Sequence, residues 1–419
     1  MTAAVTTQAR PHRTDSGARM RAFALILASL GLTAVAGCGD DATPNPSDPV
    51  AVYSSVLQRQ KQTIAAAFAS IDAAALDHKR AFRDQVVAHM RDAYGLEVGA
   101  GQPGAAAEAA EAVDSTDTSA VPRVAPADDE PDLGSVLIFA ARPDVLPRGY
   151  WQPGVVIYQP FQFSELTAAE AFIAERAALG ENIYLRAAPA SAEALDERLV
   201  FSDYPAIAMT AFHEALHNRI QLPLAIEEPL HTLLALSLTE AFAATLPATT
   251  EAEQRLRDWV GEGAVELRQD FTARASEYSA FLASLDPAAP DPEAIRRYAV
   301  DLLGLYRDAD GSDAQARYGR ADAAPYITSP LVRELRILAL EPAEQGLIGT
   351  ALVADYSTYE RRFAEVEAVL APHLDPDRVA DTLTALLDHT VPESERYSFD
   401  QATEDQALAW IADTLLAAD

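Results

Sequence analysis

Apolar side chains recur at helical spacing over most of this chain. Between residues 50 and 96, Val52, Val56, Ile64 and Phe68 follow this spacing, which predicts an N-terminal helical hairpin. Beyond residue 246 the same spacing returns almost without interruption. The expected helices are 251–285, 292–307, 330–340, 342–370, 375–389 and 403–417. These helices would form a helical C-terminal subdomain over residues 247–419.

Short β-branched and aromatic runs stand between these two helical regions. The four runs that predict strands are Val136–Phe139, Val155–Tyr158, Ile183–Leu185 and Leu199–Phe201. A helix is expected at 167–179, with Gly180 near its C-terminal end. The pattern therefore predicts an α+β fold that is predominantly α. Its central part, residues 133–246, would combine a small sheet with two buried helices.

The first of these buried helices carries the most informative motif, His213-Glu214-Ala215-Leu216-His217. Residues four apart lie one above the other on a helix, so His213 and His217 can converge on one metal ion. The spacing is expected by chance on the order of 0.01 times in a chain of this composition. Glu214 would then lie beside the ion, where a carboxylate can take a proton from an attacking water.

This HExxH motif resembles that of the zincin zinc metallopeptidases. In the gluzincin branch the third ligand is a Glu on a following helix, in a segment similar to Thr239-Glu240-Ala241-Phe242-Ala243. The resemblance implies zinc held by His213, His217 and Glu240, with Glu214 as the general base. It also implies a zincin-like catalytic domain, in which a sheet edge above the HExxH helix holds an extended peptide.

Other residues remain candidates for parts of this site. Glu227 and Glu228 compete as third ligand, although we expect them in the turn before the second buried helix, which would start near Pro229. His231 is either a core histidine, a group that supports a ligand, or a donor to the oxyanion. Tyr326 is a further candidate for stabilising the oxyanion.

A second motif lies near the N-terminus. A basic start at Met20-Arg21 precedes an apolar stretch over 23–34, which ends in Val35-Ala36-Gly37-Cys38. The last four residues resemble the lipobox of bacterial lipoproteins, which implies that residues 1–37 are a signal peptide and that Cys38 is lipidated. Met20 is a possible true start. Cys38 is the only cysteine, so no internal disulfide is expected.

Composition fits an exported globular protein. The Pro-rich segment 38–49 is expected to be a tether, and the Ala/Glu/Asp/Pro-rich segment 97–132 a linker. With 63 acidic and 32 basic residues the formal net charge is −31. Nucleic acid is therefore not an expected partner, because binding phosphates requires a basic surface.

These features together predict a zinc-dependent metallopeptidase, anchored by lipid in the bacterial cell envelope, that hydrolyses peptide bonds of a peptide or protein substrate with zinc-activated water. The main alternative is a non-catalytic surface or periplasmic lipoprotein whose zinc site is vestigial or structural. A fourth protein ligand, such as His231, would mark that alternative. A third reading is an envelope lipoprotein that binds no metal.

Overall fold

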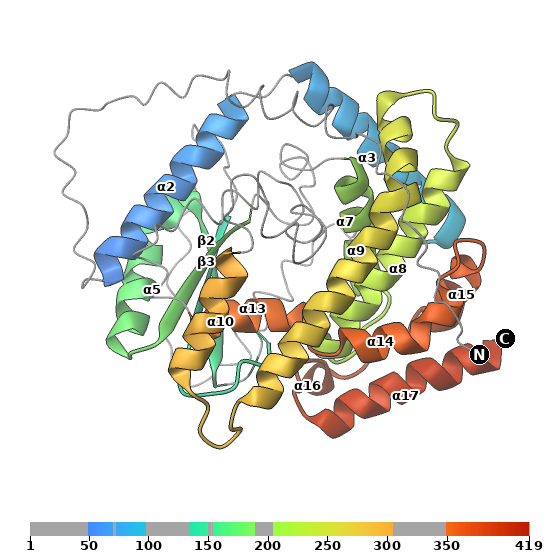
Figure 1. Ribbon diagram of the computed structural model, residues 1–419. Coiled ribbons are helices and arrows are strands. Elements are labelled where there is room, and N and C mark those ends of the chain that lie inside the picture. The colour runs from blue at the N-terminus through green and yellow to red at the C-terminus, as the bar shows by residue number, and fades with distance from the viewer. Residues whose placement is uncertain are drawn as a thin grey trace, which may run out of the picture. The chain divides into compact units, whose positions relative to one another are not determined.

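The computed structural model describes residues 49–69, 73–97, 135–149, 152, 154–188, 204–304 and 349–418. These residues belong to one compact unit that begins at Pro44. Several expected features lie outside the described residues: Cys38, Tyr326, the run Leu199–Phe201, the helix 330–340 and nearly all of the 97–132 segment. The described part is mostly helical with one small antiparallel sheet (Figure 1), which confirms the predicted fold class.

Three of the four predicted strands form this sheet. They are β1 (Ser135–Ala141), β2 (Val156–Gln162) and β3 (Asn182–Ala188). The order is β2-β1-β3 and both pairings are antiparallel, with Ile138 of β1 opposite Gln159 and Leu185. The predicted helix between β2 and β3 is α5 (Leu166–Ala178), and Gly180 follows it with a φ of +77°. Glycine adopts this left-handed conformation readily, and it terminates the helix.

The sheet and its covering helices make the first hydrophobic core. Helix α5 contacts all three strands, α13 (Thr350–Glu360) contacts β1 and β3, and α2 (Pro49–Ala69) lies on α5. The hydroxyl of Tyr53 on α2 donates to the carbonyl of Ile183 on β3 over 2.6 Å. This bond ties the N-terminal helix to the sheet.

A second core of the described residues is made mainly by helices. It contains α3 (Ala73–Tyr94), α7 (Tyr204–His217), α8 (Leu224–Thr245) and α9 (Glu251–Ser284). Helix α3 packs on α7, whereas α2 belongs to the sheet core. Both helices expected in the N-terminal hairpin exist, and their described buried residues join different cores.

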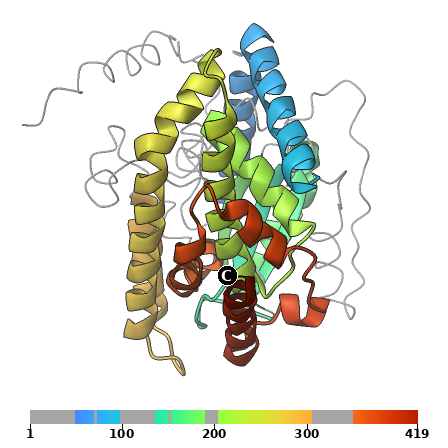
Figure 2. The same ribbon diagram turned by 90° about the vertical axis from the view of Figure 1, so that its right-hand side faces the viewer.

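Helices α14 (Phe363–Leu370) and α15 (Val379–Leu386) both contact α8, as the two perpendicular ribbon views show (Figures 1 and 2). The remaining described α-helices are α10 (Pro292–Gly304), the short α16 (Glu393–Arg396) and α17 (Gln401–Ala418). The helix predicted over 342–370 is divided, because α13 ends at Glu360 and α14 starts at Phe363.

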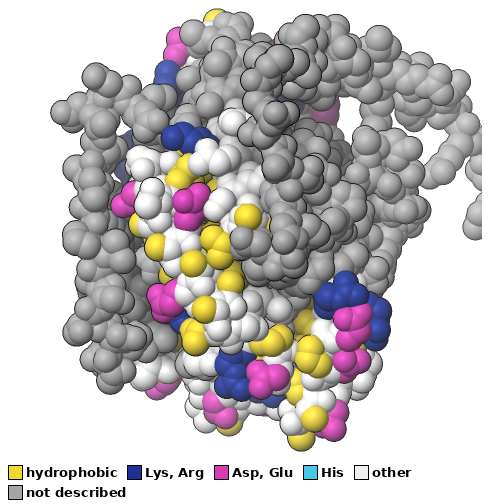
Figure 3. Space-filling view, turned by 90° about the vertical axis from the view of Figure 1, so that its left-hand side faces the viewer, with side chains coloured by type: hydrophobic (Ala, Val, Ile, Leu, Met, Phe, Trp, Pro, Cys, Tyr) yellow, Lys and Arg dark blue, Asp and Glu magenta, His cyan; other side chains and the backbone are white. Residues whose placement is uncertain are grey.

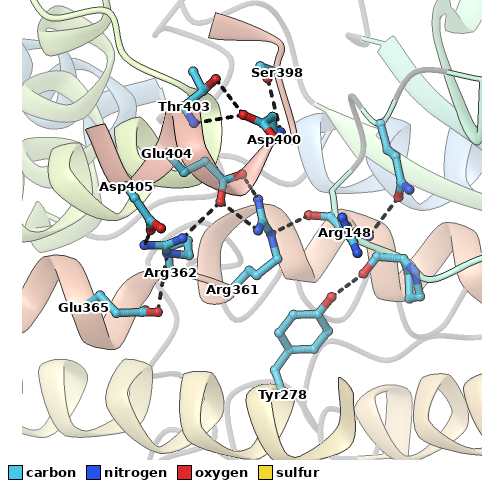
Figure 4. A network of polar contacts seen from close by, with 12 residues as sticks. Arg148, Tyr278, Arg361, Arg362, Glu365, Ser398, Asp400, Thr403, Glu404 and Asp405 are labelled. Carbon is cyan, nitrogen blue, oxygen red and sulfur yellow. Dashed lines mark hydrogen bonds and ion pairs between the residues drawn. The ribbon is translucent and has the colours of Figure 1, made fainter. Parts of the chain in front are cut away.

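A buried ion network holds α17 at the junction between α13 and α14 (Figure 4). The Glu404 carboxylate is fully buried, and Arg361 and Arg362 both pair with it, Arg361 Nη1 at 2.9 Å and Arg362 Nη1 at 3.2 Å. Arg361 also donates to the carbonyl of Arg148, and Arg362 binds Asp405 at 2.7 Å. The C-terminal helix is thus fixed to the rest of the unit by charge as well as by apolar packing.

The surface carries charges of both signs. On the face shown in Figure 3, acidic and basic side chains are interspersed with hydrophobic ones over the described residues. Among the described helices, we find none that is long and apolar enough to cross a membrane.

Candidate metal centre

Helix α7 brings the HExxH residues to its contact with α8. The Nε2 atoms of His213 and His217 lie 3.0 Å apart. His213 is buried, whereas the side chain of His217 keeps 20% of its surface exposed. The helical spacing that predicted convergence of the two imidazoles is therefore found in the structure.

The next helix begins earlier than the sequence suggested. We expected Glu227 and Glu228 in a connecting turn, but α8 already starts at Leu224 and both residues lie in its first two turns. Both are buried. The Oε2 atom of Glu228 lies 3.2 Å from His213 Nε2 and 3.8 Å from His217 Nε2. Glu228 is thus the carboxylate that faces the histidine pair.

These three atoms have the spacing of metal ligands. His213 Nε2, His217 Nε2 and Glu228 Oε2 form a triangle with sides of 3.0, 3.2 and 3.8 Å. Ligands bound at about 2.0–2.1 Å in a tetrahedral zinc site are separated by roughly 3.3 Å, which is close to the mean of these sides. The residues present therefore fit a tetrahedral metal ion with one coordination position left over.

Glu227 contacts His217 at Nδ1, the ring nitrogen that is not part of this triangle. Its Oε1 lies 2.7 Å from His217 Nδ1, and its Oε2 accepts from the Leu222 backbone N–H over 2.8 Å. Arg396 of α16 donates to both oxygens, over 2.7 and 3.2 Å. A carboxylate at Nδ1 holds the proton on that nitrogen and leaves Nε2 free to bind a metal.

His231 completes a cluster of three imidazoles. One ligand atom from each of His213, His217 and His231 lies within 4.8 Å of the others. His231 is fully buried, and its Nδ1 is 3.2 Å from His217 Nδ1, so it approaches His217 on the side of Glu227. Burial and the neighbouring His217 and His213 hold the pKa of His231 well below its usual range.

The electrostatics of the cluster favour a cation. Burial lowers the pKa of His217, but Glu228 and Glu227 outweigh this effect and raise it to about 9. Burial raises the pKa values of both glutamates, yet His217 with Arg396 for Glu227, and His217 with His213 for Glu228, keep them below the usual range. Without a metal ion the pair of carboxylates thus retains a proton on His217, which a metal ion can replace.

Glu240, the third ligand suggested by the Thr239–Ala243 segment, lies elsewhere. It is twelve residues beyond Glu228 on α8, or roughly 18 Å along the helix axis. Its carboxylate is 3.6 Å from Arg268, and burial raises its pKa. Among the described residues, the group of potential ligands comprises His213, His217 and His231 and contains neither glutamate, but only Glu228 lies within 4 Å of the histidine Nε2 atoms. The structure therefore replaces Glu240 by Glu228 as the carboxylate beside His213 and His217.

Glu214 and the sheet relate to this centre in different ways. Glu214 is partly exposed, and its charge contributes to the raised pKa of His217. The described strands pack on α5 and α13, in a different core from α7. We therefore do not find, among those strands, the edge expected above the HExxH helix. The run Leu199–Phe201, just before α7, lies outside the described residues.

Sequence reasoning kept Glu228 and His231 only as alternatives and missed Arg396. Glu228 and His231 are three residues apart, a spacing that places them on one helical face and that could have favoured them. Arg396 has no comparable signal, because it is 169 residues from Glu227. Comparison with protein families, curated proteins and solved structures found no match to the chain.

Proposed function

We propose that this protein is a zinc-dependent hydrolase of peptide bonds, tethered to the bacterial envelope by lipid at Cys38. His213, His217 and Glu228 would hold the metal. The observation that carries the proposal is the triangle formed by their ligand atoms, with sides of 3.0, 3.2 and 3.8 Å. Three protein ligands leave a position for water or substrate, which is the arrangement of catalytic rather than structural zinc.

Bound zinc would supply a Lewis acid and lower the pKa of water to about 7. Glu214 then has the role of general base. It follows His213 on α7 and is partly exposed, whereas His213 and Glu228 are buried. Its carboxylate can accept a proton at the accessible side of the cluster and deliver it to the leaving amine.

The choice of peptide substrates rests on the resemblance of the motif to zincin metallopeptidases. The acidic surface offers little attraction to polyanions, since the net charge is −31. A peptide or protein in the envelope is therefore the substrate class that fits both the motif and the charge.

The test compares wild type with Glu214→Gln, both starting after Cys38. Bound zinc and cleavage of a broad peptide library are measured on the same samples. We expect about one zinc per chain in both proteins, and loss of most cleavage in Glu214→Gln, because an amide cannot accept the proton. Glu170→Gln, at a partly exposed position of α5, is the control. Equal cleavage by Glu214→Gln and wild type, or a wild type without zinc, would refute the proposal.

One observation favours the second candidate, a non-catalytic lipoprotein with a structural zinc site. His231 is fully buried and contributes a third imidazole within metal-binding distance. If His231 were a fourth ligand, the site would be closed. In the catalytic reading, His231→Ala keeps stoichiometric zinc. In the structural reading, it loses zinc and thermal stability together, and the wild type cleaves no peptide.

A further inference from the structure

A C-terminal segment packs against the turn that joins the two helices of the metal centre. We call residues 388–396 the strap. Its backbone pairs with the turn: Asp388 N–H donates to Arg219 O over 2.9 Å, Gln221 N–H donates to His389 O over 2.8 Å, and Val391 N–H donates to Gln221 O over 3.1 Å. The strap is therefore hydrogen-bonded directly to the segment between α7 and α8.

Two arginines make ion pairs at opposite ends of this contact. At one end, Arg219 from the turn binds Asp388 of the strap with two hydrogen bonds, of 2.7 and 3.0 Å. At the other end, Arg396 from the strap binds Glu227 with two hydrogen bonds, of 2.7 and 3.2 Å. The two pairs share the same strap, but only the second one reaches the metal centre.

Arg396 neutralises one of the two buried carboxylates at the metal centre. Glu227 and Glu228 are adjacent and both buried, and two neighbouring buried carboxylates are costly unless each has a partner. Arg396 neutralises Glu227, whose Oε1 also bonds His217 Nδ1. Glu228 is then left for the metal, together with a His217 whose Nε2 faces it at 3.8 Å.

We propose that Arg396 is a positioning residue of the metal centre: through Glu227 it fixes the ring and tautomer of His217, so that full metal affinity requires the Arg396–Glu227 ion pair. This inference rests on the proposed metal site. It adds a residue of a distant helix, α16. In the bonds described above, the Arg396 side chain contacts Glu227 and not the three proposed metal ligands.

The experiment measures zinc affinity by chelator competition in wild type, Arg396→Met, Arg396→Lys and Glu227→Gln. Loss of groups that orient a metal-binding histidine commonly weakens affinity 10–100-fold. We expect that range for Glu227→Gln and about tenfold for Arg396→Met. The zinc affinity of Arg396→Lys should fall between those of Arg396→Met and wild type. Lysine keeps the positive charge but loses the planar guanidinium group that contacts both oxygens of Glu227.

Arg219→Met is the matched control, because it breaks the ion pair with Asp388 in the same strap and leaves Arg396 and Glu227 in place. We expect its zinc affinity to stay within about threefold of wild type, since its side chain makes no bond to the orienting carboxylate. Ring ¹⁵N shifts of His217, measured without zinc at a pH above its pKa of about 9, where the imidazole is neutral, report the tautomer independently of affinity. They should show Nδ1–H in wild type and Arg219→Met, and a mixture of tautomers in Arg396→Met.

The outcomes separate this inference from the proposed function. A wild type that binds no zinc refutes both. If wild type binds zinc but Arg396→Met and Glu227→Gln bind it equally well, only the positioning role is refuted. Equal losses in Arg219→Met and Arg396→Met would also refute it, since docking alone would then explain the effect. A larger loss in Arg396→Met than in Arg219→Met, together with a double variant Arg396→Met/Glu227→Gln that binds zinc no more weakly than Glu227→Gln alone, supports it.

Discussion

Replacing one of two glutamates on α8 distinguishes the ligand set that we propose from the geometry from the one suggested by the sequence motif. Glu228→Gln removes the carboxylate whose Oε2 is 3.2 Å from His213 Nε2. Glu240→Gln removes a carboxylate of the same helix that pairs with Arg268 at 3.6 Å. Both changes keep the size of the side chain and remove one negative charge, so the two variants control for each other.

The expected magnitudes differ widely. Apparent zinc-binding free energies of about 10–16 kcal/mol for four-ligand sites amount to roughly 2.5–4 kcal/mol per ligand. Glu228→Gln should therefore weaken zinc binding by about 10²–10³-fold. Glu240 is roughly 18 Å away along the helix, where its charge acts on the ion with about 2 kcal/mol at most, at an effective dielectric of about 20, and with less in salt. At an ionic strength of about 0.15 M this distance exceeds two Debye lengths, so we expect less than about threefold for Glu240→Gln.

The assay is zinc competition against a chromogenic chelator, with circular dichroism to show that each variant is folded. Both proposed ligand sets predict a folded Glu240→Gln protein, because the side chains of Glu240 and of its partner Arg268 both retain some solvent exposure. A 10²-fold loss in Glu240→Gln with wild-type affinity in Glu228→Gln would refute the ligand set derived from the structure. It would instead restore the motif-based choice of Glu240.

Two further predictions concern pH and anchoring. His217 has a pKa of about 9 in the metal-free fold against an ordinary value of 6.5, so its stabilising contribution is complete below pH 6.5 and is lost as the pH rises through 9. Chelated wild type should lose up to about 3 kcal/mol of unfolding free energy over this window, and chelated His217→Gln should not, as urea titrations at pH 6 and pH 9.5 would show. Cys38→Ser should leave the fold unchanged and move the protein from the detergent phase to the aqueous phase, whereas retention in the detergent phase would contradict lipidation.

The elements that the sequence predicted well are those with a strong local pattern. The run Val136–Phe139 falls within β1, and the amphipathic run from Glu251 is α9, whose N-terminus is capped by Thr250 and Glu253. The pair His213 and His217 converges because helical spacing alone dictates it. In these places the information needed lies within a few consecutive residues.

The start of α8 was misplaced because Pro229 was taken as a boundary. Proline removes one helical hydrogen bond, here the one that would reach the carbonyl of Ala225, and it normally marks a helix end. In this protein Leu224 to Thr239 are buried without exception, so packing on every side outweighs the lost bond. The earlier start moves Glu227 and Glu228 from a turn onto the helix face.

Local sequence patterns did not predict the contacts between segments that are distant in the chain. The N-terminal helices α2 and α3 are consecutive in sequence, but amphipathic spacing does not state which core each apolar face will join. The pair Arg396–Glu227 spans 169 residues. No single-sequence pattern links such positions, although Glu227 required some buried cationic partner once its burial was known.

The balance of charge explains why this cluster should bind a metal rather than merely form a polar core. Two buried carboxylates face one permanent cation, Arg396, so one negative charge remains. In the metal-free protein a proton on His217 compensates for it, as the raised pKa shows. A divalent ion at the triangle would compensate for it more strongly and would release that proton. His217 and Glu214 are partly exposed while His231 is fully buried, so under the proposed function we expect an attacking water to approach from the side of Glu214.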